Sequence, residues 1–143
     1  MALVDLNVWF SLLVPEHIHH SSSAQWFRGA HVDEAKFCRS TQFGVARLLA
    51  TSSAMAGKPL SVRDAWWTIQ RLMEDERVGF LHEPRGFEAI VASLLNQPTA
   101  SPKLVGDAYL AAYALASGES LVTFDRGFAQ FEGLRVVLLS DRP

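Results

Sequence analysis

The sequence predicts an α/β fold in which helices pack around a mostly parallel central sheet of about five strands. Short apolar runs alternate with longer segments that carry apolar residues at helical spacing. Strands joined by helices run parallel, because each crossover helix returns the chain to the same end of the sheet. Hydrophobic residues make up 49% of the 143 residues, which is enough for one sizeable core. We therefore expect a single domain over residues 1–143.

The expected strands are short and apolar, and two of them run directly into an acidic residue. Asp5 follows the first strand, and Asp125 ends the apolar run of the fourth. The strands are expected at Ala2–Val4, Lys36–Cys38, Val78–Leu81, Leu121–Phe124 and Val136–Leu139.

The expected helices are marked by residues that commonly begin or end them. Ser61, followed three residues later by Asp64, fits an N-cap. Ser21–Ser23 supplies N-cap candidates for a helix closed by Gly29, and Gly118 fits a C-terminal stop. Helices are expected at Asn7–Val14, through Trp26–Arg28, at Thr41–Thr51, from Ser61 through Met73, at Phe87–Leu95, at Leu104–Ala116, and for a turn or two within Asp125–Phe131.

Composition excludes several classes of protein. No apolar run approaches the roughly 20 residues that a membrane span needs, so we expect no membrane association. The single cysteine, Cys38, excludes an internal disulfide and favours a reducing cytoplasm. A net charge of −2 argues against a domain whose main task is gripping nucleic-acid backbone. It leaves room for an enzyme that contacts a few nucleotides and holds divalent cations.

Three acids are expected to meet at one edge of the sheet. Asp5 and Asp125 follow parallel strands, and ligands of such sheets bind outside the carboxyl ends of the strands. Asp107 lies one turn inside an otherwise apolar helix, where a carboxylate without a partner costs free energy. Carboxylates are the hard ligands that Mg²⁺ or Mn²⁺ prefers. Each acid also has a structural alternative: Asp5 and Asp125 as N-caps, and Asp107 as a first-turn acid favoured by the helix dipole.

Three motifs, taken in order, resemble those of PIN-domain nucleases. Their spacing and the chain length are similar to the VapC-type toxins of bacterial toxin–antitoxin pairs, and the resemblance covers nearly the whole chain. It implies a PIN-like three-layer domain. The motifs are Leu3-Val4-Asp5-Leu6-Asn7-Val8, Asp107-Ala108-Tyr109-Leu110-Ala111-Ala112-Tyr113-Ala114 and Leu121-Val122-Thr123-Phe124-Asp125-Arg126-Gly127-Phe128.

The resemblance implies a metal-dependent endoribonuclease. Asp5, Asp107 and Asp125 match the acids that bind Mg²⁺ or Mn²⁺ and activate water to cut RNA. Asn7 and Thr123 match positions that support this acid pocket. The resemblance also implies a cognate VapB-type antitoxin, which covers the pocket and inserts a basic side chain among the acids, and a homodimer.

One departure concerns a glutamate that the family usually carries in the helix after the second strand. Its place falls near Gly44, and no acid occurs between Ala35 and Arg63. Gln42 could offer a neutral oxygen to a metal-bound water. The missing carboxylate favours hydrolysis with one metal over two. It also keeps an alternative open, a degenerate PIN fold that binds RNA or a protein partner without cutting.

Further residues have two interpretations each. Arg47 and Arg126 flank the expected pocket, where they could contact phosphate or pair with the acids. Aromatic residues are enriched in interface cores, so the helix with Trp66, Trp67 and Leu72 and the segment around Trp9-Phe10 are candidate docking surfaces. The histidines at 17, 19 and 20 fit a solvated helix entrance better than a metal site. A phosphoacceptor signalling domain is disfavoured, because no lysine follows residue 103.

Overall fold

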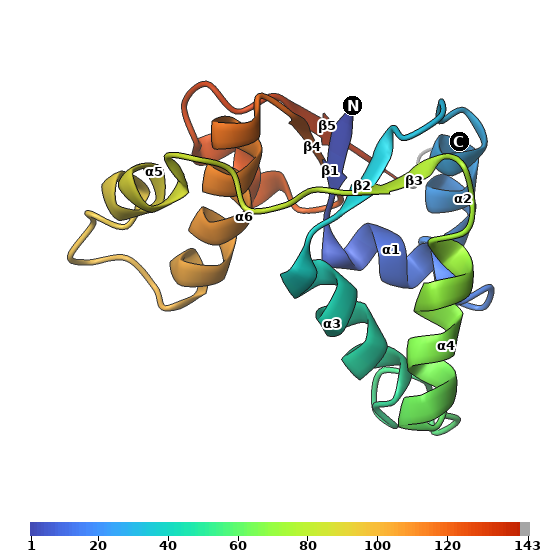
Figure 1. Cartoon of the computed structure of the whole chain (residues 1–143). Coiled ribbons are helices and arrows are strands. Elements are labelled where there is room, and N and C mark those ends of the chain that lie inside the picture. Colours follow the sequence, from blue (N-terminus) through green and yellow to red (C-terminus); the bar gives the residue numbers. More distant parts are fainter. Residues whose placement is uncertain (141–143) are drawn as a thin grey trace.

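The computed structural model describes residues 1–140 and contains a five-stranded sheet with helices on both faces (Figure 1). The strand order is β3-β2-β1-β4-β5, and every neighbouring pair is parallel. The expectation of a mostly parallel sheet of about five strands is confirmed. The strands are β1 Ala2–Val4, β2 Ala35–Phe37, β3 Val78–Phe80, β4 Ser120–Thr123 and β5 Val136–Leu138.

The strand order creates a switch point at the centre of the sheet. The chain builds outward from β1 to β2 and β3, then returns to place β4 and β5 on the other side of β1. Ligands of open parallel sheets bind where the order reverses in this way. Val4 pairs in register with Val122, so the residues that follow β1 and β4 emerge at the same edge.

Within residues 1–140, six α-helices and one short 3-10 helix, η1, surround the sheet. Figure 1 shows α1 to α4 on one side, and α5 and α6 on the other. Their bounds are α1 Leu6–Leu13, α2 His20–Arg28, α3 Arg39–Leu49, α4 Val62–Leu72, α5 Phe87–Leu94, α6 Lys103–Ser117 and η1 Arg126–Gln130.

Successive side chains of the central strands contribute to two separate hydrophobic cores. Val4 and Val122 point into the core beneath α1 to α4, while Leu3 and Leu121 point into the core beneath α6. Successive side chains of a strand face opposite sides, so one short strand stabilises both layers. The first core includes Trp9, whose ring stacks on that of Phe37 in β2 with the ring centroids 3.9 Å apart.

Helix ends follow the expected chemistry at two places and depart from it at a third. The Ser61 hydroxyl accepts a hydrogen bond from the Asp64 backbone at 3.0 Å, and Gly118 ends α6 with a φ of 70°. The N-cap expected at Ser21–Ser23 is wrong, because α2 begins at His20. Ser23 is instead buried, and its hydroxyl bonds to that of Ser11.

The docking surface expected around Trp9-Phe10 is also wrong. Trp9 is fully buried and Phe10 is nearly so, because the apolar face of α1 packs against the sheet. Within residues 1–140, no helix is long and apolar enough to cross a membrane.

Candidate active site

Asp5 lies where β1 meets α1, and both of its oxygens are hydrogen-bonded. Oδ1 accepts from the backbone N–H of Leu6 at 2.7 Å, which caps the helix, and Oδ2 accepts from the Thr123 hydroxyl at 2.6 Å. Burial raises the pKa of the Asp5 carboxyl, and repulsion from Asp125 and Asp107 adds to the rise. The two hydrogen bonds oppose this shift.

Thr123 joins the first acid to the third. Its fully buried hydroxyl donates to Asp5 and accepts a hydrogen bond from the Asp125 backbone N–H at 3.0 Å. This single side chain at the end of β4 therefore fixes two acids that lie 120 positions apart in the sequence. Asp125 in turn caps η1, since its Oδ1 accepts from the Gly127 N–H at 2.7 Å.

Asp107 reaches the same edge from α6. It lies one turn above Lys103, whose ammonium contacts Oδ2 of Asp107 and Oδ2 of Asp125, at 2.9 Å each. The lysine, more than the Gly127 N–H, holds the pKa of Asp125 below its usual range. The two acids raise the pKa of Lys103 in return.

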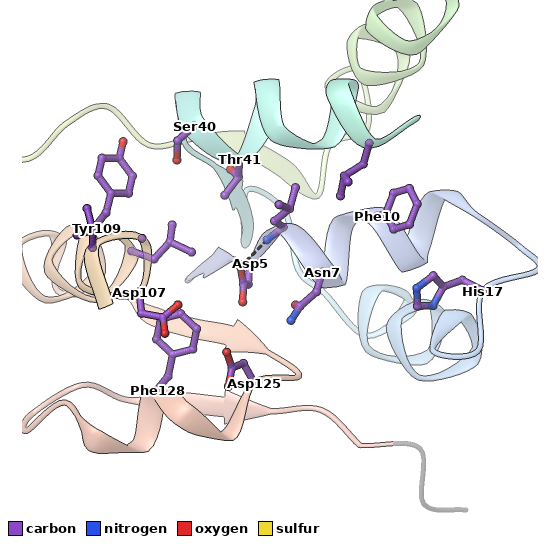
Figure 2. Close-up of a pocket in the computed structure, with 15 residues that line it drawn as sticks. Asp5, Asn7, Phe10, His17, Ser40, Thr41, Asp107, Tyr109, Asp125 and Phe128 are labelled. Atoms are coloured by element: carbon purple, nitrogen blue, oxygen red, sulfur yellow. Dashed lines mark hydrogen bonds between the residues drawn. The ribbon is translucent and has the colours of Figure 1, made fainter. Parts of the chain in front are cut away.

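The three acids share the wall of a cavity of about 640 Å³. Figure 2 shows their carboxyl groups turned toward a common space, with Phe10 and His17 on one side and Tyr109 on the other. Ser40 and Thr41 contribute hydroxyl groups from the start of α3. We call this space the acidic cavity; its lining is Asp5, Leu6, Asn7, Phe10, His17, Ser40, Thr41, Leu48, Val105, Gly106, Asp107, Tyr109, Leu110, Asp125 and Phe128.

Three residues considered from the sequence do not line the acidic cavity. Gln42 is buried, and its amide oxygen accepts from the Arg39 guanidinium at 2.6 Å. Arg47 lies exposed beside a second groove between α3 and α4. Arg126 is exposed at the start of η1.

The structure brings in residues that sequence reasoning missed. Lys103 is the main one, because it was not among the candidate site residues. Its spacing of four residues from Asp107 signals an ion pair on one helix, but nothing in the sequence signals its second contact, with Asp125. Tyr109 lies two positions after Asp107, and its place on the cavity wall follows only from how α6 packs.

The donor set fits a hard divalent cation. Carboxylate and amide oxygens are the ligands that Mg²⁺ and Mn²⁺ favour. The side-chain oxygen of Asn7 is buried on the cavity wall, and no group in residues 1–140 forms a hydrogen bond with it. Burying an acceptor without a partner costs free energy. A bound cation, or a water molecule on that cation, would satisfy this oxygen. In the same residues, no three His, Cys, Asp or Glu side chains stand close enough to form a ready-made metal site.

Comparison with known proteins shows which family this chain resembles. The family profile of the PIN domain matches residues 2–134. Ribonuclease VapC41 of Mycobacterium tuberculosis is 36% identical over 145 aligned residues, which cover 98% of this chain and 99% of that protein. Ribonuclease VapC29 of the same organism is 31% identical, over 96% and 95% of the two chains.

Two solved structures have the same fold at low sequence identity. VapBC2 of Rickettsia felis, bound to a DNA fragment from its promoter, matches with a TM-score of 0.68 and 8% identity, over 97% of this chain and 98% of that one. Mycobacterium tuberculosis VapC20, described as a toxin that cleaves the sarcin–ricin loop, matches with a TM-score of 0.67 and 16% identity, over 94% and 99%.

Proposed function

This chain belongs to the PIN domain family and, within it, to the VapC ribonucleases, and from that premise we propose that it is the toxin of a toxin–antitoxin module. Its activity is metal-dependent endonucleolytic hydrolysis of RNA. The observation that carries the proposal is the convergence of Asp5, Asp107 and Asp125 on one cavity at the switch point of the sheet.

Each acid has a distinct part in this proposal. Asp5 and Asp107 would hold Mg²⁺ or Mn²⁺, and Asp125 would hold it directly or through water. A divalent cation bound by these residues would lower the pKa of a water molecule and neutralise charge on the phosphate. Thr123 fixes the orientation of Asp5 and Asp125 through its two hydrogen bonds. Asn7 supplies a neutral oxygen from the first turn of α1.

Hydrolysis by an activated water fixes the chemistry of the product ends. In-line attack of water on phosphorus leaves a 5′-phosphate and a 3′-hydroxyl. Attack by the ribose 2′-hydroxyl would instead leave a cyclic phosphate and would need no metal.

RNA cleavage with end-group analysis tests the proposal. Purified protein with Mn²⁺ should cut RNA to 5′-phosphate ends, and EDTA or Asp107→Asn should abolish cutting. Glu132→Gln changes an exposed acid on the loop before β5 and serves as the matched control, with activity unchanged. Cyclic ends, or cleavage that survives both EDTA and Asp107→Asn, would overturn the mechanism.

The alternative, an RNA- or protein-binding fold without cleavage, is favoured by the wall that α3 contributes. The α3 residues that line the cavity are Ser40, Thr41 and Leu48, and none carries a carboxylate. A Cβ built on Gly44 would lie 3.1 Å from a methyl group of Leu6. If Mn²⁺ binds and RNA binds but no RNA is cut, this alternative replaces the nuclease.

A cognate VapB-type antitoxin is the proposed protein partner. The groove between α3 and α4, of about 530 Å³, is lined mainly by apolar and aromatic residues that include Phe43, Val62 and Trp66. Phe43 and Val62 are 56% and 80% exposed and line the same groove, and apolar side chains that gather on one surface can mark a protein interaction site. We propose that an apolar segment of the antitoxin occupies this groove while a basic side chain enters the acidic cavity.

Expression in cells tests the toxin assignment. The chain alone should arrest growth, and co-expression with the neighbouring reading frame should relieve the arrest. Asp107→Asn should be harmless at equal expression. Harmless expression of the soluble wild-type chain would contradict the assignment. The proposed homodimer is tested separately by sedimentation of the purified protein.

A further inference from the structure

Lys103 places a positive charge between two of the three acids. Its ammonium lies 2.9 Å from Oδ2 of Asp107 and 2.9 Å from Oδ2 of Asp125. The first contact spans one helical turn, but the second joins α6 to Asp125, which lies two residues after β4 and 22 positions from Lys103. The lysine side chain is 65% exposed, against 17% for Asp107 and 31% for Asp125.

A lysine that served only to stabilise α6 would need just one of these contacts. Pairs four residues apart on a helix form without help from another element. The contact with Asp125 therefore reflects the charge of the cavity, where unpaired carboxylates repel one another. The ammonium lies between these two carboxylates, and a divalent cation bound by both would compete for the same oxygen atoms.

The lysine is also able to leave. Its stem is long and flexible, its side chain is largely in solvent, and ion pairs so exposed are weak because water screens them. An incoming divalent cation competes for the same carboxylate oxygens with twice the charge. Withdrawal of the lysine into solvent would need no rearrangement of α6.

We propose that Lys103 is a built-in stand-in cation, which holds Asp107 and Asp125 together in the metal-free protein and is displaced when the divalent ion binds. This inference rests on the proposed metal site. Its consequence is quantitative: because the ion must first displace the ammonium, Lys103 lowers the affinity of the acidic cavity for metal. Lys103 is thus a positioning residue for the acids and sets the ion concentration at which the site fills.

Calorimetric titration with Mn²⁺ tests the inference without any activity measurement. Lys103→Gln should bind Mn²⁺ about three- to tenfold more tightly than wild type, the range expected when weak exposed ion pairs no longer compete. Lys103→Met, which keeps the length of the stem without its charge, should do the same. Lys58→Gln removes a charge from another exposed lysine and should leave the affinity unchanged.

Thermal unfolding supplies a second readout. Without metal, Lys103→Gln should have a lower Tm than wild type, because no positive charge then offsets the repulsion between Asp107 and Asp125. With saturating Mn²⁺ the two proteins should converge, so the gain in Tm on adding metal is larger for the variant.

The outcomes separate this inference from the proposed function. If both Lys103 variants bind Mn²⁺ no more tightly than wild type while Asp107→Asn loses binding, the metal site stands and the stand-in role is overturned. If Asp107→Asn binds Mn²⁺ as well as wild type, the proposed metal site itself fails, and the inference fails with it.

Discussion

At the scale of single residues, the capping role and the site role of an acid turn out to be compatible. Asp5 uses one oxygen to cap α1 and the other to accept from Thr123. Asp125 uses one oxygen to cap η1 and offers the other to Lys103. A cap fixes the carboxyl group in one orientation. The helix ends therefore preorganise the acids that the proposed cation needs.

The buried carboxyl of Asp5 should make metal-free stability fall as pH rises. Folding raises its pKa above the ordinary value of 3.8, so the folded state holds the proton more tightly than the unfolded state does. Stability is then fully present below pH 3.8 and is lost as pH climbs through the raised pKa. Asp5→Asn keeps an oxygen for the Leu6 N–H but cannot ionise.

Melting curves of the metal-free proteins between pH 4 and pH 8 check this expectation. The Tm of Asp5→Asn should gain on that of wild type as pH rises, even though the variant loses Mn²⁺ binding. Glu132→Gln should follow wild type across the range. A constant Tm difference between Asp5→Asn and wild type would show that burial does not disfavour the ionised carboxyl.

Thr123 should matter through its hydroxyl rather than its methyl group. Thr123→Val keeps the shape but leaves the Asp5 oxygen and the Asp125 N–H without their partner, at a cost of about 1–3 kcal/mol. Thr123→Ser keeps the hydroxyl and should lose much less stability and little Mn²⁺ affinity. Urea unfolding and Mn²⁺ titration of both variants check this, and equal losses in both would point to the methyl group instead.

Sequence alone predicts the acids better than the groups around them. Asp5 and Asp125 follow strands, and parallel strands bring their ends to one edge, so their meeting was predictable. Lys103 was not, because its reach to Asp125 depends on how α6 packs over β4. Whether Gln42 points into the cavity or toward Arg39 likewise depends on how α3 is rotated about its axis. The sequence pattern does not fix that rotation to better than a fraction of a helical turn.

At the scale of elements, α3 is the helix in which the resemblance to the family predicts a glutamate that this sequence lacks. Gly44 stands near the place of the missing glutamate, and the side chain of Leu6 approaches it closely. Ser40 and Thr41, one turn earlier, line the acidic cavity. The leucine and the glycine thus complement each other in volume, and a Cβ at Gly44 requires the leucine side chain to shift by a few tenths of an ångström.

Restoring the glutamate should therefore need two substitutions. Gly44→Glu alone places its Cβ 3.1 Å from Leu6, so we expect lower stability and at most a small gain in Mn²⁺ affinity. Gly44→Glu with Leu6→Ala makes room for the carboxylate and should tighten Mn²⁺ binding by about tenfold or more, as an added hard ligand does.

Calorimetry on the wild type, both single variants and the double variant isolates this coupling. Gly44→Gln with Leu6→Ala is the matched control, because it fills the same space without charge. If the glutamate and glutamine double variants bind Mn²⁺ equally, α3 does not face the ion, and the alignment of this helix with the family is wrong.

Helix ends were predictable where one residue decides them, and less so where packing decides. Gly118 adopts the left-handed conformation that L residues disfavour, so its role as a stop was visible in the sequence. The N-cap predicted at the serines of α2 was wrong because Ser23 is buried between two helices, where its hydroxyl bonds to that of Ser11. A serine's preference for caps is local, whereas its burial is a property of the tertiary structure.

At the scale of the whole molecule, the two candidate sites lie on different parts of the fold. Its carboxyl edge carries the acidic cavity, and α3 and α4 carry an exposed apolar groove. The parallel arrangement followed from the alternation of strands and helices. The strand order did not, because nothing local in the sequence states that β4 returns to the free side of β1.

The groove and the cavity should be separable by mutation if the groove holds the antitoxin. Phe43 lines the groove, is more than half exposed and packs against Trp66 with ring centroids 5.1 Å apart. Phe43→Glu places a charge in an apolar contact and should weaken the complex by about 2 kcal/mol or more, roughly 30-fold in Kd. None of the three acids is touched, so RNA cleavage and toxicity should persist.

Cells that carry both reading frames provide the test. Phe43→Glu should arrest growth even with the antitoxin present, whereas wild type should not. Val32→Glu places the same charge on an exposed apolar residue of the loop before β2 and should remain fully neutralised. The doubly changed Phe43→Glu, Asp107→Asn chain should be harmless, which would tie the arrest to the acidic cavity. If the antitoxin still neutralises Phe43→Glu at equal expression, the α3–α4 groove is not where it binds.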